Sequence, residues 1–460
     1  MKENTGVARE RFGSSLGAIF TAAGAAVGLG NIWGFPYVAG KNGGGVFVIM
    51  YLVAVLLIGI PLMISEFVIG REGRKNMIGS LKKLAPGTSW HLGGWLCVVS
   101  CFLILGFYGV VAGWSMAHVV KALGGVFVGL GAEEIGKNFG AFINDPYWPV
   151  VWHGIFMGAT AFVVMGGLRN GIERFAKVVM PLLFVILVVL MVRSLTLDGA
   201  QAGLDFLFRP DFSVVRWKTV AIAIGAAFFS IGVGNGVMVT LGSYMDDKDN
   251  LAKDAFMVSM TDTAVAVISG LAIFPAVLAL GFEPAKSSGL AFVTVPAVLQ
   301  QLPGGLMVHY VFTVLFFLLL SIAALSSSVT TLEVVVAYFC EDMNVRRPVA
   351  VAGVAGAMFA IGIPCALSVG AVNIKVMGVP LVWFLVDFIE AFLLPLGGII
   401  CVLFVGWHLP RKQVEGALSR DETIPWYFEV FYTLIRYIIP VVIFVVLAFT
   451  ANEYFFHIGG

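Results

Sequence analysis

The sequence predicts an all-α integral membrane protein, and three observations lead to this fold class. Of the 460 residues, 59% are hydrophobic and only 12% are charged, whereas soluble domains carry about 25% charged residues. Apolar runs of about 20 residues or more, long enough to cross a bilayer as helices, recur along the whole chain. Two of these runs are interrupted by glycine-rich stretches, GAAVGLGN at 24–31 and SIGVGNG at 230–236.

The apolar runs predict eleven transmembrane helices. In order, we expect them at 16–39, 45–70, 91–121, 149–166, 175–196, 219–244, 256–281, 307–339, 348–369, 379–406 and 427–450. The first run is too long, and too closely followed by others, to be a cleaved signal peptide. The longest stretches between the runs, at 122–148, 197–216, 282–306 and 407–426, are expected to be loops with short surface helices. Residues 1–460 are therefore predicted to form a single membrane domain.

The two glycine-rich interruptions lie in the first and the sixth predicted helix. Glycine costs about 1 kcal/mol per residue against alanine inside a helix. In a bilayer, open backbone is tolerated only where it is buried in protein or faces a polar cavity. Interrupted helices at corresponding places in two halves of a chain are typical of the substrate and ion site of a secondary transporter. Gly24 and Gly28 also form a GxxxG pattern, which is typical of close helix packing. Such packing would account for only one of the two glycine-rich interruptions.

The distribution of positive charge predicts the orientation of the chain. Lys and Arg concentrate on the side of the membrane where the chain begins, and one loop there holds Arg71, Arg74, Lys75, Lys82 and Lys83. Cytoplasmic loops carry such an excess. We therefore expect a multi-pass protein of the plasma (inner) membrane with a cytoplasmic N-terminus. An odd number of helices then leaves the C-terminus extracellular or periplasmic.

Other function classes find little support in the residues. The six histidines include no HExxH pattern, and the glycine-rich stretches follow no strand of a βαβ unit. Glu66 and Asp262 with scattered serines do not form a catalytic set, and a channel would need a continuous polar pore lining. We expect no enzyme activity, no organic cofactor and no nucleic-acid partner. Five cysteines in or at the ends of apolar helices are interpreted as small core residues: Cys97, Cys101, Cys340, Cys365 and Cys401.

Five segments carry a family resemblance: GNIWGFPYVAGKNGGGVFVIMYL, IPLMISEFVIGR, FYGVVAGW, GLAIFPAVLALG and AALSSSVTTLEVVVAYF. They resemble the neurotransmitter:sodium symporter family in its bacterial amino-acid branch, and the similarity runs from about residue 9 to 405. The resemblance implies the LeuT fold. In that fold, helices one to five (16–196) and six to ten (219–406) form inverted repeats, and helices one and six are unwound. The eleventh helix at 427–450 lies outside the repeats, and many relatives have a twelfth.

The resemblance implies sodium-coupled symport of an amino acid or a closely related zwitterion. Family members that carry amines without a carboxylate have an aspartate where this chain has Gly28, so glycine implies a substrate with a carboxylate. Phe229 resembles the aromatic lid, and Asn235 and Thr331 suggest a pocket that can form hydrogen bonds. The implied substrate-binding residues are Ala26, Gly28, Leu29, Gly30, Ile104, Tyr108, Phe229, Ser230, Gly232, Asn235, Ser327 and Thr331.

Two sodium sites are also implied, and sodium is a hard ion that prefers oxygen ligands. The first would use Ala26, Asn31, Ser230 and Asp262, and the second Gly24, Val27, Ala323, Ser326 and Ser327. Because Asp262 supplies a negative charge that animal members obtain from chloride, we predict chloride independence. Two plainer interpretations remain. In the first, Asp262 is not an ion ligand but a hydrated carboxylate at the membrane edge. In the second, the serine hydroxyls of 326–328 form hydrogen bonds within their own helix.

The resemblance also implies gating residues. Arg9 and Phe12 match an amino-terminal latch, with Tyr244 and Glu341 or Asp342 as partners. Gly171 and Pro181 match a spacing that lets the fifth helix unwind as the inside opens, although ordinary helix punctuation gives the same pattern.

The chain departs from the family at Gly34, where an arginine usually closes the outer vestibule. Asp387 and Glu390 are available on helix ten, and neither can be assigned to that gate.

Two other functions fit the same residues. Asp262 could titrate, so a proton could replace one sodium ion. A protein of the same fold could also bind an amino acid as a sensor without transporting it. The lipid bilayer and a small amino-acid-like molecule are the expected partners, and the substrate and the oligomeric state are left open.

Overall fold

The computed structural model describes residues 10–282, 289–419 and 423–456, and most of them lie in helices. In the first half of the chain the α-helices are α1 (Ser15–Ala26), α2 (Phe35–Lys41), α3 (Gly45–Ala54), α4 (Ile60–Gly73), α5 (Met77–Leu84), α6 (His91–Leu123), α7 (Ala132–Asn144), α8 (Trp148–Met165), α9 (Arg174–Leu195), α10 (Gln201–Phe208) and α11 (Trp217–Ser230). They continue with α12 (Val237–Gly242), α13 (Leu251–Ala279), α14 (Val295–Leu299), α15 (Leu306–Glu341), α16 (Arg347–Ser368), α17 (Leu381–Phe388), α18 (Leu394–Leu403), α19 (Arg411–Leu418), α20 (Phe428–Thr433) and α21 (Ile439–Phe456).

Short turns of other helix types join these elements. The π-helical turns are η1 (Gly30–Gly34), η2 (Val55–Gly59), η3 (Leu168–Glu173), η5 (Leu290–Thr294), η6 (Ile389–Leu393), η7 (Phe404–His408) and η8 (Leu434–Ile438), and η4 (Phe212–Val214) is a 3-10 turn. In the described residues the strands are β1 (Lys375–Val376) and β2 (Val379–Pro380), which pair antiparallel as a small hairpin.

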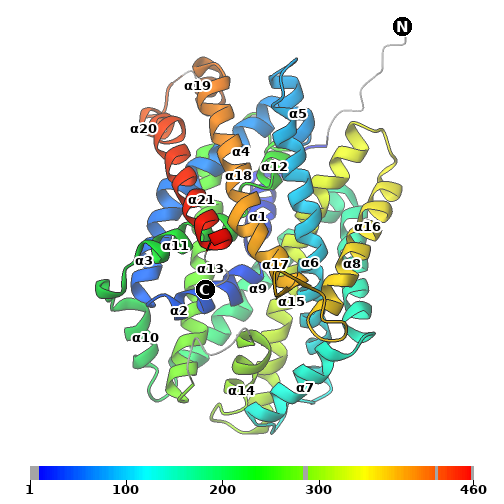
Figure 1. Ribbon diagram of the computed structural model, residues 1–460, viewed down its shortest axis with the longest axis vertical. Helices are drawn as coiled ribbons and strands as arrows, with labels where there is room; N and C mark the ends of the chain where they lie inside the picture. The colour runs from blue at the N-terminus through cyan, green and yellow to red at the C-terminus, as the bar shows by residue number, and fades with distance from the viewer. Residues whose placement is uncertain (1–9, 283–288, 420–422, 457–460) are drawn as a thin grey trace.

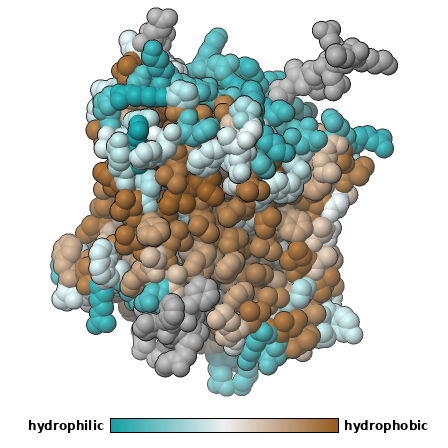
Figure 2. Space-filling model, turned by 45° about the horizontal axis from the view of Figure 1, so that its top comes forward, coloured by the Kyte–Doolittle hydropathy of each residue, from teal (hydrophilic) through white to brown (hydrophobic). Residues whose placement is uncertain are grey.

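Many of the helices are long and apolar enough to cross a membrane, as the sequence predicts. Within the described ranges, nine spans meet this test by length and composition, and α1 with residues 30–41 makes a tenth, bent by 53°. The helix at Trp217–Ser230 is apolar but shorter. On the face shown in Figure 2, hydrophobic residues form a brown band between teal residues at the two ends. The protein is a multi-pass membrane protein.

The predicted helix positions agree with the structure to within a few residues, except in the fifth and sixth segments. The fifth was expected to start at 175, but helical backbone begins at Leu168 in η3. In the sixth segment, helix α11 ends at Ser230, and only the six residues of α12 are helical after the interruption.

The two interruptions meet near the centre of the molecule, where α1 packs among α9, α13, α15 and α12 (Figure 1). Helix α1 ends at Ala26, and the backbone is extended at Val27 (ψ 107°) before η1 begins at Gly30. In the second interruption, Gly232, Gly234 and Gly236 have φ values of 65°, 87° and 78°. Residues with a Cβ rarely adopt such values, so the glycines are what allow the chain to leave and re-enter the helix here.

Candidate functional site

A cavity of about 50 Å³ lies between the two interruptions. All but one of the predicted substrate-binding residues line it: Ala26, Gly28, Gly30, Ile104, Tyr108, Phe229, Ser230, Gly232, Asn235, Ser327 and Thr331. The exception is Leu29, which lines a larger neighbouring cavity. Three apolar lining residues were missed by the sequence analysis: Ala25, Leu105 and Leu394. Nothing distinguishes them in the sequence from ordinary helix packing.

Gly28 lies between two polar side chains. A Cβ at this position would come within 2.7 Å of Ser327 Oγ and 2.8 Å of Tyr108 Oη. Its absence lets both hydroxyls approach the open backbone, and Tyr108 Oη accepts a hydrogen bond from the amide of Leu29 (3.1 Å). An aspartate could not occupy position 28 without displacing these groups. The wall around Gly28 therefore offers hydroxyl and amide groups.

Asp262 lies at the centre of a buried polar cluster beside the cavity. Its Oδ1 accepts from Asn31 Nδ2 (2.6 Å), and its Oδ2 accepts from Ser230 Oγ (2.7 Å) and Tyr51 Oη (3.2 Å). Asn31 in turn accepts from the amide of Gly28 (3.0 Å). The side chain of Asp262 has no exposed surface. The alternative of a carboxylate hydrated at the membrane edge is therefore wrong.

Tyr51 is the member of this cluster that sequence analysis missed. It is fully buried on α3 and also donates to Ser230 Oγ (2.8 Å). A single tyrosine in an apolar helix has no feature that separates it from a packing residue. Only the meeting of α3, α11 and α13 reveals it.

A second group of oxygens joins α1 to α15. Ser327 Oγ lies 3.0 Å from the carbonyl oxygen of Val27 and 3.4 Å from that of Gly24. Ser326 Oγ lies 3.2 Å from the Val27 oxygen and 2.9 Å from that of Ala323. All five residues predicted for the second sodium site are thus brought together. The alternative of bonding within the helix fits Ser328, which donates to Ala324 (2.8 Å), and it holds in part for Ser326 and Ser327, whose hydroxyls also lie 2.9 Å and 3.5 Å from the Ala323 carbonyl of the same helix.

Asn235 and Thr331, the two polar residues that suggest a pocket able to form hydrogen bonds, also have hydrogen-bond partners within the protein. Thr331 Oγ1 donates to the carbonyl of Ser327 one turn earlier (2.8 Å). Asn235 Oδ1 accepts from the amide of Val237, the first residue of α12 (3.1 Å). This side-chain oxygen satisfies an amide that the helix start leaves without a partner. Asn235 therefore supports the local fold as well as lining the pocket.

The comparisons with known proteins identify the family. The sodium:neurotransmitter symporter family model matches residues 9–127 and 147–457. The chain belongs to this family. An uncharacterised sodium-dependent transporter of Bacillus subtilis, YhdH, is 36% identical over 95% of the chain and 96% of its own length. An uncharacterised sodium-dependent transporter of Haemophilus influenzae is 32% identical over 95% of the chain and 97% of its own length.

A solved structure shares the fold. The crystal structure of MhsT in complex with L-phenylalanine aligns with a TM-score of 0.89 at 40% identity. The alignment covers 96% of this chain and 100% of MhsT. The chain is thus a sodium-dependent symporter family member with the LeuT fold, and a transporter of this family is not expected to be an enzyme.

The predicted latch of this symporter lies at the end of the molecule where α1 begins. The amide of Phe12 donates to the carbonyl of Tyr244 (3.2 Å), and their rings meet edge to face at 6.2 Å. Glu341 accepts from the amide of Asn76 (2.7 Å) at the start of α5. Arg9 lies outside the described residues. Its neighbour Arg11 forms exposed ion pairs with Asp246 (3.3 Å) and Asp247 (3.5 Å).

Two buried glutamates at the same end were missed. Glu333 of α15 accepts from Tyr244 Oη (2.8 Å) and pairs with Arg347 Nη2 (2.5 Å). Glu173 of η3 accepts from the amide of Gly13 (2.7 Å) and pairs with Lys177 (2.6 Å). A charged residue within an apolar helix marks a candidate functional residue. On this ground the sequence predicted a site at Asp262 but not at Glu173 or Glu333.

Gly171 and Pro181 both lie in the fifth span. A Cβ at Gly171 would come within 2.2 Å of the Val163 carbonyl oxygen, so α8 and η3 cross in close contact. Pro181 lies inside α9.

A second and larger cavity, of about 400 Å³, adjoins the central one. Phe229, predicted as the aromatic lid, lines both cavities, as do Tyr108, Gly30 and Ser230. Gly34 lines the larger cavity, and a Cβ there would have no atom within 4 Å.

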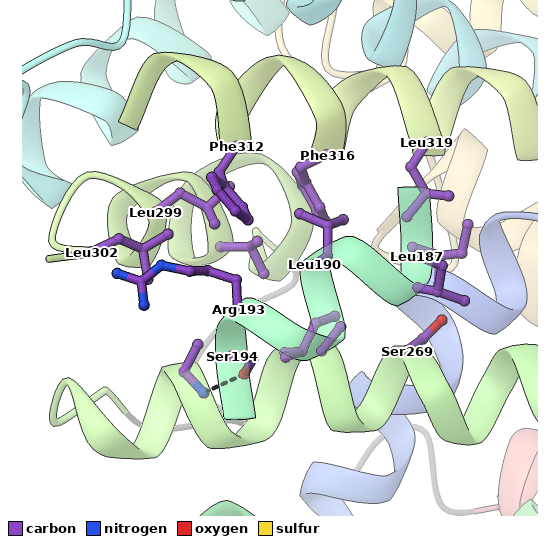
Figure 3. A pocket seen from close by; sticks show the side chains of 15 residues that line it. Leu187, Leu190, Arg193, Ser194, Ser269, Leu299, Leu302, Phe312, Phe316 and Leu319 are labelled. Atoms are coloured by element: carbon purple, nitrogen blue, oxygen red, sulfur yellow. Dashed lines mark hydrogen bonds between the residues drawn. The ribbon is translucent and has the colours of Figure 1, made fainter. Parts of the chain in front are cut away.

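A further cavity, of about 30 Å³, lies among α9, α13 and α15 (Figure 3). Leucine and phenylalanine side chains dominate its wall. The hydroxyl of Ser194 accepts from the amide of Ala276 (2.9 Å), which is the dashed line in Figure 3. Arg193 also belongs to the lining, but the cavity is smaller than the central one and mostly apolar.

Proposed function

We propose that this protein is a symporter that couples sodium to the uptake of an amino acid or a closely related zwitterion. The observation that carries the proposal is the buried carboxylate of Asp262, bonded to Asn31, Ser230 and Tyr51 beside the central cavity. A carboxylate without exposed surface needs compensation by donors or by a cation. MhsT, crystallised with L-phenylalanine, supports an amino acid as the molecule that shares this site.

Two sodium ions are the proposed coupling ions. The first would be held by Ala26, Asn31, Ser230 and Asp262, and the second by Gly24, Val27, Ala323, Ser326 and Ser327. The oxygen-rich composition of both groups fits a hard cation. The negative charge of Asp262 makes the transporter independent of chloride in this proposal.

The substrate carboxylate is proposed to lie against Gly28, Leu29 and Tyr108. Glycine leaves hydroxyl and amide groups on this wall, and an aspartate there would repel a carboxylate. The carbonyl oxygens freed around Gly232 would accept hydrogen bonds from the substrate ammonium. In transporters of this architecture, the negative ends of half-helices hold cationic groups and the positive ends hold anionic groups. Phe229 closes the site from the outer side.

The proposed topology has eleven transmembrane helices. Counting the interrupted segment at 217–242 as one span adds an eleventh to the ten that length and composition support. Residues 16–196 and 219–406 would form the inverted repeats of one transport domain, with 427–450 as the added helix. The N-terminus would be cytoplasmic and the C-terminus extracellular or periplasmic, in the plasma (inner) membrane.

A thermal-shift screen of the purified protein against the twenty amino acids tests the function. The screen is run in sodium and in potassium, with chloride present or replaced by gluconate. We expect one amino acid, or a small group, to stabilise the protein only in sodium and equally in both anions. Stabilisation in potassium that strengthens at low pH would favour proton coupling instead.

Uptake into proteoliposomes separates a transporter from a sensor. The amino acid identified in the screen is radiolabelled, and a sodium gradient is imposed. Sodium-driven accumulation inside the vesicles is the expected result. Binding without accumulation would assign the chain to the sensor alternative.

A further inference from the structure

Arg436 is a charged residue inside a membrane-spanning helix, and it has no carboxylate partner. It lies in η8 within the span Phe428–Asn452, where it is the only charged residue after Glu429. Across the part of the chain that the structure describes, Arg436 forms no ion pair, and its Nε is buried without a hydrogen-bond partner. A charged side chain in such a helix is costly and almost always has a partner, so an unpaired one marks a candidate site.

Three aromatic rings border the guanidinium group. Its carbon lies 4.8 Å from the ring centroid of Trp407, 5.6 Å from that of Tyr437 and 5.7 Å from that of Tyr432. Nη1 also donates to Tyr432 Oη (3.3 Å). A guanidinium has five N–H donors, so most of them have no acceptor among the described residues. The rings orient the group and leave its charge and its donors for a ligand.

Contacts with the preceding span fix the position of Arg436. Trp407 Nε1 donates to the Arg436 carbonyl (2.8 Å), and Tyr432 Oη donates to the Gly406 carbonyl (3.2 Å). A Cβ at Gly406 would come within 3.1 Å of the Arg436 Cα, so η7 and η8 cross in close contact. The guanidinium is therefore held in place by two spans.

The surface around Arg436 faces lipid near the level of the headgroups. Trp407 is 57% exposed and Tyr437 54% exposed, and both residue types are enriched at membrane–water interfaces. Arg436 follows Phe428, the first residue of the span, by about 12 Å along the helix axis. Its side chain points back toward that end, because it contacts Tyr432 one turn earlier. The guanidinium can therefore reach the polar edge of the bilayer.

Arg411 provides the contrast that identifies the missing partner. Its guanidinium carbon lies 5.4 Å from the Tyr432 ring centroid, and it pairs with Glu415 of α19 (2.8 Å) and with Glu429 of α20. The carboxylates on these two helices are thus already used. Arg436 is left for an anion from outside the chain.

We propose that Arg436, Trp407 and Tyr437 form a binding site for the headgroup of an anionic phospholipid. The guanidinium fork matches two oxygens of a phosphate group. A lipid is favoured over soluble phosphate because the exposed rings beside the guanidinium offer apolar surface to acyl chains. Figure 1 shows α19 and α20 at the same end of the molecule as α5, which is the cytoplasmic end in the proposed orientation. The site does not depend on the function proposed for the central cavity.

Thermal unfolding of the full chain in neutral detergent micelles tests the proposal. The micelles are titrated with phosphatidylglycerol, with phosphatidylcholine, whose phosphate is neutralised by its own ammonium, or with inorganic phosphate. We expect phosphatidylglycerol to stabilise the protein at a concentration lower than that of phosphatidylcholine by about fivefold, the contribution of about one basic residue at an anionic membrane surface. Equal effects of the two lipids would overturn the proposal. Equal stabilisation by inorganic phosphate would assign the site to a soluble anion instead.

Variants locate the site. Arg436→Gln should remove the preference for phosphatidylglycerol, and Arg436→Lys should keep most of it because the charge remains. Lys82→Gln is the matched control, since it removes one exposed positive charge at the same end of the molecule. A preference that survives in Arg436→Gln, or that falls equally in Lys82→Gln, would refute a site at Arg436.

A second measurement needs no variant at position 436. Phospholipids with brominated acyl chains quench the fluorescence of nearby tryptophans, and the difference between the native protein and Trp407→Phe gives the part due to Trp407. We expect brominated phosphatidylglycerol to quench this part at lower concentration than brominated phosphatidylcholine does. Equal quenching by both would contradict the site even if sodium-coupled transport is confirmed.

Discussion

At the scale of single residues, Gly28 illustrates how an absent side chain defines a site. A methyl group there would be within 2.8 Å of two hydroxyl oxygens, Ser327 Oγ and Tyr108 Oη. Both hydroxyls are held by hydrogen bonds to the open backbone, Tyr108 Oη by the amide of Leu29 and Ser327 Oγ by the carbonyl of Val27. The position is therefore restricted by its surroundings and not by its own backbone angles.

Replacement of Gly28 by alanine should lower both stability and substrate affinity. Overpacking in such a site costs about 1–3 kcal/mol, so we expect a lower melting temperature and weaker amino-acid binding. Gly34→Ala is the matched control, because its added methyl group meets no atom within 4 Å. Differential scanning fluorimetry with and without the amino acid measures both effects. Equal behaviour of the two variants would show that the hydroxyls are free to retreat.

Asp262→Asn should weaken sodium binding and introduce a chloride effect. The substitution removes the buried charge and leaves donors from Asn31 and Tyr51 poorly matched, at a cost of about 1–3 kcal/mol each. We expect the sodium concentration for half-maximal stabilisation to rise more than about tenfold. Chloride should lower that concentration in the variant and leave it unchanged in the native protein.

Thr261→Val serves as the control for this prediction. Thr261 precedes Asp262 on α13, and its hydroxyl bonds only to the Met257 carbonyl in the same helix (2.8 Å). A similar loss of sodium affinity in both variants would indicate a general defect of α13.

Single residues could be predicted from the sequence where their chemistry conflicts with their surroundings. Asp262 and the serine triplet at 326–328 stand out in apolar helices. In the structure Asp262 contacts Asn31 and Ser230, and Ser326 and Ser327 lie against the Val27 carbonyl, whereas Ser328 bonds within its own helix. Tyr51 and Leu105 conflict with nothing and were missed, because their roles arise only from which helices meet. Leu29 was predicted for its backbone amide, which donates to Tyr108 Oη beside the central cavity, while the residue itself lines the neighbouring larger cavity.

At the scale of elements, Glu173 ties the segment before α1 to the start of the fifth span. Its carboxylate accepts from the amide of Gly13 (2.7 Å) and the hydroxyl of Ser14 (3.3 Å). Gly17 packs so closely that a Cβ there would overlap the carboxylate, at 2.0 Å from Oε1. Any movement of the segment before α1 must therefore break charge-assisted hydrogen bonds to η3.

Glu173→Gln should loosen this segment. The amide keeps the shape of the side chain but loses the charge that holds Gly13 and Lys177. We expect faster hydrogen exchange over residues 10–18 and 166–175, measured by mass spectrometry. Glu133→Gln is the matched control, since Glu133 forms an (i, i+4) pair with Lys137 that is almost fully exposed, and such pairs contribute little. Unchanged exchange in the Glu173 variant would contradict the coupling.

The elements themselves were largely predictable, because hydropathy alone marks long apolar helices. The start of the fifth span was not. The apolar run that predicted it begins at 175, whereas the π-helical turn η3 starts at Leu168, and Gly171 within it packs so closely that a Cβ there would lie 2.2 Å from the Val163 carbonyl oxygen. Local propensity is a weak guide where neighbouring helices determine the backbone.

At the scale of the whole molecule, the proposed coupling has an electrical consequence. One elementary charge that crosses 100 mV releases about 2.3 kcal/mol. Two sodium ions would release about 4.6 kcal/mol, enough for roughly three decades of substrate gradient at ~1.4 kcal/mol per decade. This estimate assumes a zwitterionic substrate, which carries no net charge.

The proposed orientation predicts which ends of the molecule face the outside. Lys82 on α5 and Lys137 on α7 are both exposed, and Figure 1 places these helices at opposite ends of the structure. A membrane-impermeant maleimide applied to intact cells should label Lys137→Cys and spare Lys82→Cys. Labelling of both variants after permeabilisation provides the control. The reverse pattern would invert the topology.

The orientation and the repeat organisation could be proposed from charge bias and resemblance, whereas the positions of the cavities could not. Both cavities depend on side chains from at least four spans. Phe229 lines both of them through packing against residues far away in the sequence, such as Gly30.

The helix cap formed by Asn235 limits how the substrate preference of this protein can be re-engineered. Most side chains placed at position 235 would lose the hydrogen bond from the Val237 amide, at a cost of about 0.5–2 kcal/mol. A variant such as Asn235→Phe would change the pocket and the start of α12 together, so its altered selectivity would be hard to interpret. Libraries at Ile104 and Thr331, which lie in the middle of continuous helices, should yield more folded variants. New specificities are therefore more accessible from those two positions.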